Sequence, residues 1–277
     1  MYRILALLLL CVGAAAVADE LSLVAQLERA VNGEHRSDEQ IARNRYRHPI
    51  GTLEFFGLEQ GMTVLEIWPG SGWYTEILAP VLRDSGLFAV ATWDPEVEGQ
   101  PSYRYELPKE MQGKFEAHPD IYDRVEVVYY SPPDTESLGG PRYDMILTFR
   151  NAHGWLRNGH AQDIFNDMAA ALVPGGVLGV VQHRKDGDQI MGDHDGGYLT
   201  EATVIDLAEK AGLVLEARSE INANPLDTQD HPGGVWTLPP SLRLGEQDRE
   251  KYLAIGESDR MTLRFRKPSP ENGLQVD

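Results

Sequence analysis

Short apolar segments alternate with amphipathic segments along most of this chain. A short apolar run bounded by glycine or proline is typical of a buried strand in a parallel sheet, whereas apolar residues three and four positions apart indicate one face of a helix. The first such pair is the apolar run 62–67, which ends before Pro69, and the helical pattern Trp73–Arg83. The same patterns predict strands at 62–67, 87–92, 125–130, 143–149, 177–182, 213–220 and 261–266.

Helical patterns precede the first strand and separate several of the later ones. Residues 19–60 are predicted to form an N-terminal helical extension, with helices at Leu21–Val31, from Ser37 as the N-cap through Arg47, and at Pro49–Phe56. Because strands and helices alternate with short connections, the predicted fold class is α/β, with a mostly parallel seven-stranded sheet and helices on both faces. The later helices are predicted at Tyr103–Phe115, Ala161–Leu172 and Glu201–Ala211.

A long segment, residues 222–260, separates the last two predicted strands. It contains several prolines and glycines and one candidate helix, Glu246–Ile255. A long ordered connection beside the ends of strands is usually functional, so we expect this insertion to form a lid over a substrate pocket. The strand after it, Met261–Arg266, alternates apolar and polar residues, which indicates one buried and one more polar face.

The turn after the first strand carries the first candidate chemistry. Glu66 stands near the end of the strand, and Gly70 and Gly72 lie in the turn that follows it. Glycines spaced in this way let a backbone loop pass close to a ligand, and ligands of open α/β sheets sit outside the carboxyl ends of the strands. A dinucleotide fingerprint requires a third glycine at the position of Thr75, so the pattern indicates a different nucleotide-like cofactor.

This turn resembles the first motif of class I S-adenosylmethionine (SAM) methyltransferases, and further segments match that family at similar intervals. The resemblance implies a Rossmann-like class I methyltransferase fold for residues 61–268, an antiparallel last strand, and SAM as the cofactor. The further matching segments are Leu87–Ala91 with Asp94, Val125–Tyr130 with the loop containing Asp134, Tyr143–Thr148, and the turn Leu172–Gly176 before Val177–Val181.

The resemblance also assigns cofactor-binding roles. Glu66, Gly70 and Gly72 correspond to the cofactor loop, Asp94 to the acid that accepts hydrogen bonds from the ribose hydroxyls, and Asp134 to the aspartate near the adenine amino group.

One residue of the loop departs from the family pattern. Trp68 occupies the position where the first glycine of the motif is expected. Its indole either crowds the methionyl arm of SAM or packs beneath the loop. We predict packing beneath the loop, because Pro69 stiffens the turn and the neighbouring acid and glycines are present.

The carboxyl end of the fourth strand is where an acceptor-positioning group or a base is expected, because methyl transfer requires alignment of the acceptor and, for some acceptors, removal of a proton. His153 is the candidate proton acceptor, and Asn151 is the candidate for orienting the acceptor. The alternative for His153 is a hydrogen bond to the loop backbone. His183 and His194 follow the fifth strand and are interpreted as pocket or solvated-loop residues; no metal ligand set is expected, since their spacing matches no metal motif.

The N-terminus has the three parts of a secretory signal peptide. Arg3 precedes an apolar run from Ile4 to Val17, and a small-residue cleavage site ends at Ala18. Residues 1–18 are therefore predicted to be removed, which places the mature chain in the periplasm or the medium; a retained membrane anchor is the alternative. The single cysteine, Cys11, leaves with this segment. Residues 269–277 are expected to form a flexible tail.

Charge and motif content together define the functional hypotheses. The 277 residues carry a formal net charge of −18, which argues against nucleic acid or an anionic membrane as a partner and leaves a small-molecule substrate. The pattern Arg150-Asn151-Ala152-His153, with His183 and His194, resembles a group of signal-peptide-bearing bacterial predicted methyltransferases of unassigned substrate. The leading hypothesis is an exported SAM-dependent methyltransferase. The alternatives are a non-catalytic periplasmic binding protein on the same fold and a metal-assisted hydrolase using His183 and His194.

Overall fold

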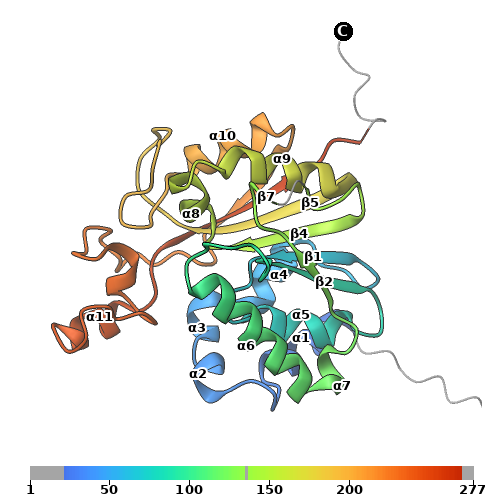
Figure 1. Cartoon of the computed structure of the whole chain (residues 1–277). Helices are drawn as coiled ribbons and strands as arrows, with labels where there is room; N and C mark the ends of the chain where they lie inside the picture. Colours follow the sequence, from blue (N-terminus) through green and yellow to red (C-terminus); the bar gives the residue numbers. More distant parts are fainter. Residues whose placement is uncertain (1–21, 135–136, 270–277) are drawn as a thin grey trace, which may run out of the picture.

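The strands form one sheet in the order β3-β2-β1-β4-β5-β7-β6 (Figure 1). The computed structural model describes residues 22–134 and 137–269. β1, β2, β3, β4 and β5 pair in parallel, and β7 is antiparallel to both of its neighbours, β5 and β6. The predicted α/β class, the mostly parallel seven-stranded sheet and the antiparallel last strand are confirmed. The strands are β1 (Thr63–Ile67), β2 (Leu87–Thr92), β3 (Glu126–Tyr129), β4 (Tyr143–Phe149), β5 (Leu172–His183), β6 (Val214–Ser219) and β7 (Arg260–Arg266).

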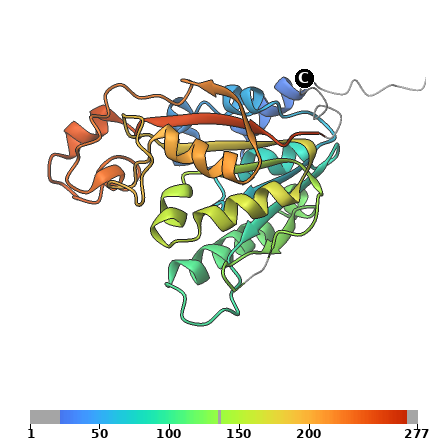
Figure 2. The ribbon, with the colours of Figure 1, turned by 90° about the horizontal axis from the view of Figure 1, so that it is seen from above.

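Helices cover both faces of the sheet, as Figures 1 and 2 show. One face packs against α1, α4 and α5, with Met111 of α6 and Tyr122 of α7, and the other packs against α8, α9 and α10. The helices are α1 (Leu23–Val31), α2 (Asp38–Ile41), α3 (Asn44–Arg47), α4 (Pro49–Phe56), α5 (Thr75–Leu82), α6 (Tyr103–Ala117), α7 (Pro119–Tyr122), α8 (Ala152–Arg157), α9 (Ala161–Ala171), α10 (Glu201–Lys210) and α11 (Arg249–Ile255).

The apolar run of β1 is buried on both sides, which explains why it reads as a continuous hydrophobic segment. Leu65 and Ile67 contribute to the core under α8 to α10, whereas Val64 contributes to the core under α1, α4 and α5. β1 lies between β2 and β4, with Ile67 opposite both Ala91 and Thr148. The carboxyl ends of these three strands therefore meet at one edge of the sheet.

The prediction of a single helix from Ser37 through Arg47 is wrong. The chain instead forms α2 and α3, separated by a turn at residues 42–43. Tertiary hydrogen bonds fix the start of α3, because the Asn44 side chain donates to the Val31 carbonyl at 2.9 Å and accepts from Arg36 at 3.1 Å. Local propensity carries no information about such contacts with a neighbouring helix.

The insertion 222–260 lies beside the carboxyl ends of β4 and β5 (Figure 1). It contains the short 3₁₀ helix η1 (Gly234–Thr237) and α11, which begins at Arg249, three residues later than the predicted helix. Within residues 22–134 and 137–269, no helix is long and apolar enough to cross a membrane. The predicted signal peptide and residues 270–277 of the predicted tail lie outside the described residues.

Candidate functional site

The turn after β1 is closed by its own backbone and by a buried carboxyl group. The Gly72 amide donates to the Pro69 carbonyl at 3.0 Å, and Gly70 and Gly72 have positive φ angles of 61° and 82°. Thr75, which replaces the third glycine of a dinucleotide motif, donates its hydroxyl to Glu66 at 2.6 Å. Burial raises the pKa of Glu66 to about 7, while the Thr75 hydrogen bond opposes this shift. Glu66 thus holds the loop onto the first turn of α5.

A second contact ties the same loop to α6. The Lys114 ammonium donates to the Ser71 carbonyl at 2.7 Å and also pairs with the buried Glu76 carboxylate. A methyl group added at Gly70 would meet no atom within 4 Å, so the loop opens onto free space at that residue. The loop backbone is therefore held by Glu66 and Lys114, and it remains accessible to a ligand at Gly70.

The Trp68 indole is buried in an aromatic cluster next to this loop, and whether it supports the loop or crowds a bound cofactor stays a prediction. The side chain is only 8% exposed, it stacks on Trp93 with ring centroids 5.1 Å apart, and it meets Trp155 edge-on at 5.7 Å. Its ring nitrogen donates to the Tyr130 carbonyl at 3.0 Å. Since these partners lie directly after β2, directly after β3 and within α8, the indole joins three parts of the fold in one aromatic cluster.

Asp94 and Asp134 stand just beyond the carboxyl ends of β2 and β3. Their loops are connected through Ser131, whose hydroxyl accepts from the Asp94 amide at 2.8 Å and whose carbonyl accepts from the Asp134 amide at 2.9 Å. One Asp94 oxygen also accepts from the Glu96 amide at 2.9 Å. Neither aspartate lines the cavity described next, and their cofactor-binding roles stay predictions.

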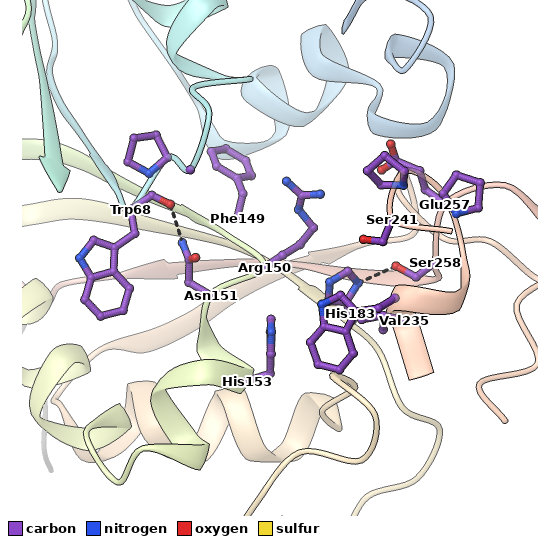
Figure 3. A pocket seen from close by; sticks show the side chains of 15 residues that line it. Trp68, Phe149, Arg150, Asn151, His153, His183, Val235, Ser241, Glu257 and Ser258 are labelled. Atoms are coloured by element: carbon purple, nitrogen blue, oxygen red, sulfur yellow. Dashed lines mark hydrogen bonds between the residues drawn. The ribbon is translucent and has the colours of Figure 1, made fainter. Parts of the chain in front are cut away.

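A cavity of about 300 Å³ lies at the carboxyl ends of β1, β4 and β5 (Figure 3). It is walled on one side by the loop after β1 and by the residues that follow β4, and on the other side by the insertion. The cavity-lining residues are Trp68, Pro69, Gly70, Phe149, Arg150, Asn151, His153, His183, Val235, Trp236, Pro239, Pro240, Ser241, Glu257 and Ser258.

His153 lies on α8, a helix that was not predicted, and faces the cavity. Its Nδ1 accepts from the Gln182 amide at 3.3 Å, and the same amide nitrogen donates to the Gly197 carbonyl at 3.1 Å. This orientation assigns the ring proton to Nε2. Burial, followed by the proximity of His194, lowers the pKa of His153 to about 4, so the ring is neutral at neutral pH. In this tautomer it offers the cavity a hydrogen-bond donor.

Asn151 connects β4 to the end of β1. Its amide nitrogen donates to the carbonyls of Ile67 and Trp68, at 2.9 and 3.2 Å, and to the Thr148 hydroxyl at 3.1 Å. Only the amide oxygen remains for a ligand, since three acceptors occupy the nitrogen. Any acceptor-orienting role must therefore use the carbonyl oxygen of this side chain.

His183 completes the polar lining from β5. Its Nδ1 lies 2.5 Å from the Ser258 hydroxyl, and its ring centroid is 5.6 Å from that of His153 (Figure 3). Burial and then the proximity of His153 hold the pKa of His183 well below its usual value. When Nδ1 donates to Ser258, the free Nε2 lone pair can accept a proton, which makes His183 a candidate proton acceptor that the sequence had not indicated, although its lowered pKa makes it a weak base.

His194 lies beside His153 and Trp236 but does not itself line the cavity. Its ring centroid is 5.5 Å from that of His153, and its Nδ1 accepts from the Gly197 amide at 2.9 Å. In the part of the chain that the structure describes, no group of three or more histidine, cysteine, aspartate or glutamate side chains is arranged to hold a metal ion.

Arg150 is the residue of this site to which the sequence assigned no role. It follows β4 directly, adopts a left-handed conformation with φ of 65°, and extends its guanidinium toward the centre of the cavity (Figure 3). An arginine at the carboxyl end of a buried strand was the signal available in the sequence. The charge that surrounds it became visible only in the tertiary structure.

Solved structures with the same architecture include a SAM-dependent methyltransferase from Aquifex aeolicus, at 15% identity over 88% of this chain and 98% of that chain, with a TM-score of 0.54. The N-methyltransferase NodS of Bradyrhizobium japonicum, in complex with S-adenosyl-L-homocysteine, is 15% identical over 90% of this chain and 100% of that chain, with a TM-score of 0.50. The chain has the Rossmann-like methyltransferase fold.

The fold alone does not determine the reaction. The [4+2]-cyclase SpnF is also similar, at 16% identity over 89% of this chain and 94% of that chain, with a TM-score of 0.57. No protein-family model and no curated protein matches the sequence. The activity therefore has to be argued from the site.

Proposed function

We propose that this protein is an exported SAM-dependent methyltransferase that acts on a small molecule outside the cytoplasm. The observation that carries the proposal is the glycine turn after β1, held by the Glu66–Thr75 hydrogen bond and opening at Gly70 onto a cavity lined by two neutral histidines. The arrangement of strands around this turn is that of the methyltransferases named above.

The residues at the end of β1 fit one end of SAM. Gly70 leaves room for a ligand against the loop, and the backbone of the turn is fixed by Glu66 and Lys114. Asp94 and Asp134 are the proposed partners of the ribose and the adenine, by their positions after β2 and β3. Bound SAM supplies a methyl group that its sulfonium activates for in-line displacement.

The side chains around the cavity would orient the methyl acceptor and receive its proton. His183 can receive a proton at Nε2 from an acceptor hydroxyl or amine, while its Nδ1 is held by Ser258. His153 can donate from Nε2 to an acceptor oxygen, and this hydrogen bond would orient the acceptor. The insertion contributes Trp236, Pro239 and Pro240 to the cavity wall, and as the proposed lid it would exclude water from this side.

The alternative is a non-catalytic binding protein that retains the fold. It is favoured by the Trp68–Trp93 stack, which fills the space between the ends of β1 and β2 with aromatic rings. The cavity opens instead toward β4, β5 and the insertion. A binding protein would use that cavity without a cofactor in the loop.

Calorimetric titration of the purified protein with SAM and with its demethylated product distinguishes the two. A methyltransferase binds both compounds in a one-to-one ratio. A protein that is folded by circular dichroism and binds neither compound contradicts the enzyme proposal and supports the binding protein. The unknown acceptor is not needed for this measurement.

A further inference from the structure

Four arginines gather around a single buried carboxylate at the back of the cavity. Glu257 is 3% exposed and accepts from Arg43 at 2.7 Å and from Arg47 and Arg260 at 3.0 Å each. Burial by itself would raise the pKa of the Glu257 carboxyl. The positive charges of the arginines outweigh this effect and hold the pKa far below its usual range. Both carboxylate oxygens are therefore already shared among three cations.

Arg150 is the fourth arginine of this group, and it is the one that faces the cavity. Its guanidinium forms no hydrogen bond or ion pair with any residue in 22–134 or 137–269, and it lines the cavity together with Ser241 and Ser258. Burial lowers the pKa of Arg150 to about 10, so the group stays protonated at neutral pH. Glu257 opposes this shift of the Arg150 pKa, and Arg260 and Arg43 add to it.

Glu257 is the one carboxylate of the cavity lining, and the other three arginines already pair with it. His153 and His183 are neutral at neutral pH, and Glu66 lies beneath the loop, where Thr75 binds it. A partly buried cation without a partner costs stability, and four clustered arginines repel one another. Beside this cavity, four guanidinium groups therefore surround one carboxylate, and an anion bound at Arg150 would reduce the excess of positive charge.

We propose that Arg150 binds an anionic group, a carboxylate or a phosphate, on the small molecule that enters this cavity. A guanidinium presents parallel N–H donors that match two oxygens of either group. The hydroxyls of Ser241 and Ser258 add donors beside it, and Phe149 and Trp236 form apolar walls for the body of the molecule. As an assignment of the methyl acceptor class, the inference rests on the proposed function.

The test uses three small probes whose binding is followed by tryptophan fluorescence, because Trp68 and Trp236 line the cavity. Benzoate and phenyl phosphate carry the two anionic groups on an apolar ring, and benzamide has the shape of benzoate without its charge. We expect the wild type to bind benzoate or phenyl phosphate at least tenfold more tightly than benzamide. Equal binding of all three probes overturns the proposal.

Variants at Arg150 assign the effect to its guanidinium. Arg150→Met should weaken binding of the anions at least tenfold without weakening benzamide, and Arg150→Lys should retain part of the preference. Arg157→Met, which removes a half-exposed arginine on α8 that does not line the cavity, should bind all three probes as the wild type does. Wild-type affinity of Arg150→Met for the anions overturns the proposal.

Thermal melting separates a ligand-binding role from a structural one. Because Arg150 repels its neighbours and has no partner, Arg150→Met should melt at the wild-type temperature or higher. Melting several degrees lower than the wild type would mean that the guanidinium stabilises the fold, and the proposal would then fail.

The last arm distinguishes the acceptor from the cofactor, since SAM carries a carboxylate of its own. Benzoate is titrated again in the presence of saturating S-adenosyl-L-homocysteine, which has the same carboxylate. Unchanged benzoate affinity assigns Arg150 to the acceptor, and competition assigns it to the cofactor and overturns the acceptor assignment. If S-adenosyl-L-homocysteine does not bind at all, the proposed function fails. The comparison of benzoate with benzamide still shows whether Arg150 binds an anion.

Discussion

The indole rings of Trp68 and Trp93 stack with their centroids 5.1 Å apart and their planes inclined by 29°. Trp68 stands where the methyltransferase motif that this turn resembles has a glycine, and Trp93 immediately precedes Asp94. The stack therefore connects the turn after β1 to the residue proposed to bind the ribose.

Trp68→Gly should lower the free energy of unfolding by about 3–5 kcal/mol, because it removes a buried indole and its hydrogen bond to Tyr130. We expect the wild type to bind SAM and the glycine variant to lose both stability and affinity, whereas Trp68→Phe should retain more of each. Chemical denaturation and calorimetry measure the two effects. Tight SAM binding by the glycine variant, with none by the wild type, would mean that the indole blocks the cofactor.

Asp94→Ala should weaken SAM binding by about 1.5–3 kcal/mol, since a carboxylate that accepts from ribose hydroxyls forms charge-assisted hydrogen bonds. Glu96→Ala, which removes an exposed carboxylate two residues further on, is the matched control and should bind as the wild type does. Equal affinity of Asp94→Ala and the wild type in the same calorimetric titration would show that the ribose assignment is wrong.

Glu66→Gln should change how stability depends on pH. The buried carboxyl has a pKa of about 7, above the value of 4.5 for an exposed glutamate, so the folded state binds more protons than the unfolded state between these values. Wild-type stability relative to Glu66→Gln is therefore greatest below pH 4.5 and falls by about 3 kcal/mol as the pH rises through 7.

Urea denaturation at several pH values measures this difference between the two proteins. Thr75→Val removes the hydrogen bond that opposes the shift, and it should extend the loss of stability to higher pH. A difference that stays constant from pH 4 to pH 8 would contradict the account of Glu66.

Asn151→Ala should destabilise the fold by about 1–3 kcal/mol, because the amide nitrogen satisfies the carbonyls of Ile67 and Trp68. Asn151→Asp should cost more, since it places a carboxylate against these two oxygens. Thermal and chemical unfolding provide the measurement. An aspartate variant as stable as the wild type would show that the amide does not connect β1 to β4.

The native protein should begin near Asp19 and be recovered from the periplasm or the medium. The charged start, apolar run and small-residue site at the N-terminus motivate this prediction. Mass spectrometry of the N-terminal peptide checks it, with the cytosolic fraction as the control. Recovery of an intact Met1 would support a retained anchor instead.

Periodicity along the chain was sufficient to predict the seven strands and most of the longer helices. β1, β2 and β4 are buried on both sides, so their apolar runs carry the signal within the segment itself. The turn after β1 was also readable, because Gly70 and Gly72 adopt positive φ angles that other residues disfavour. The short helix α8 was not predicted, and α3 was predicted as part of one longer helix with α2. Tertiary contacts rather than the local pattern determine these two helices.

Sequence alone placed Glu66, Asp94, Asp134, Asn151 and His153 at the ends of strands, because the order of elements determines which ends share one edge of the sheet. It could not show that the Asn151 amide donates hydrogen bonds to the carbonyls at the end of β1. It could not show the arginine cluster either, because Arg43 and Arg47 meet Glu257 across more than 200 residues of chain. Periodicity reports which face of a segment is buried, whereas the partner of each buried charge depends on how distant segments pack.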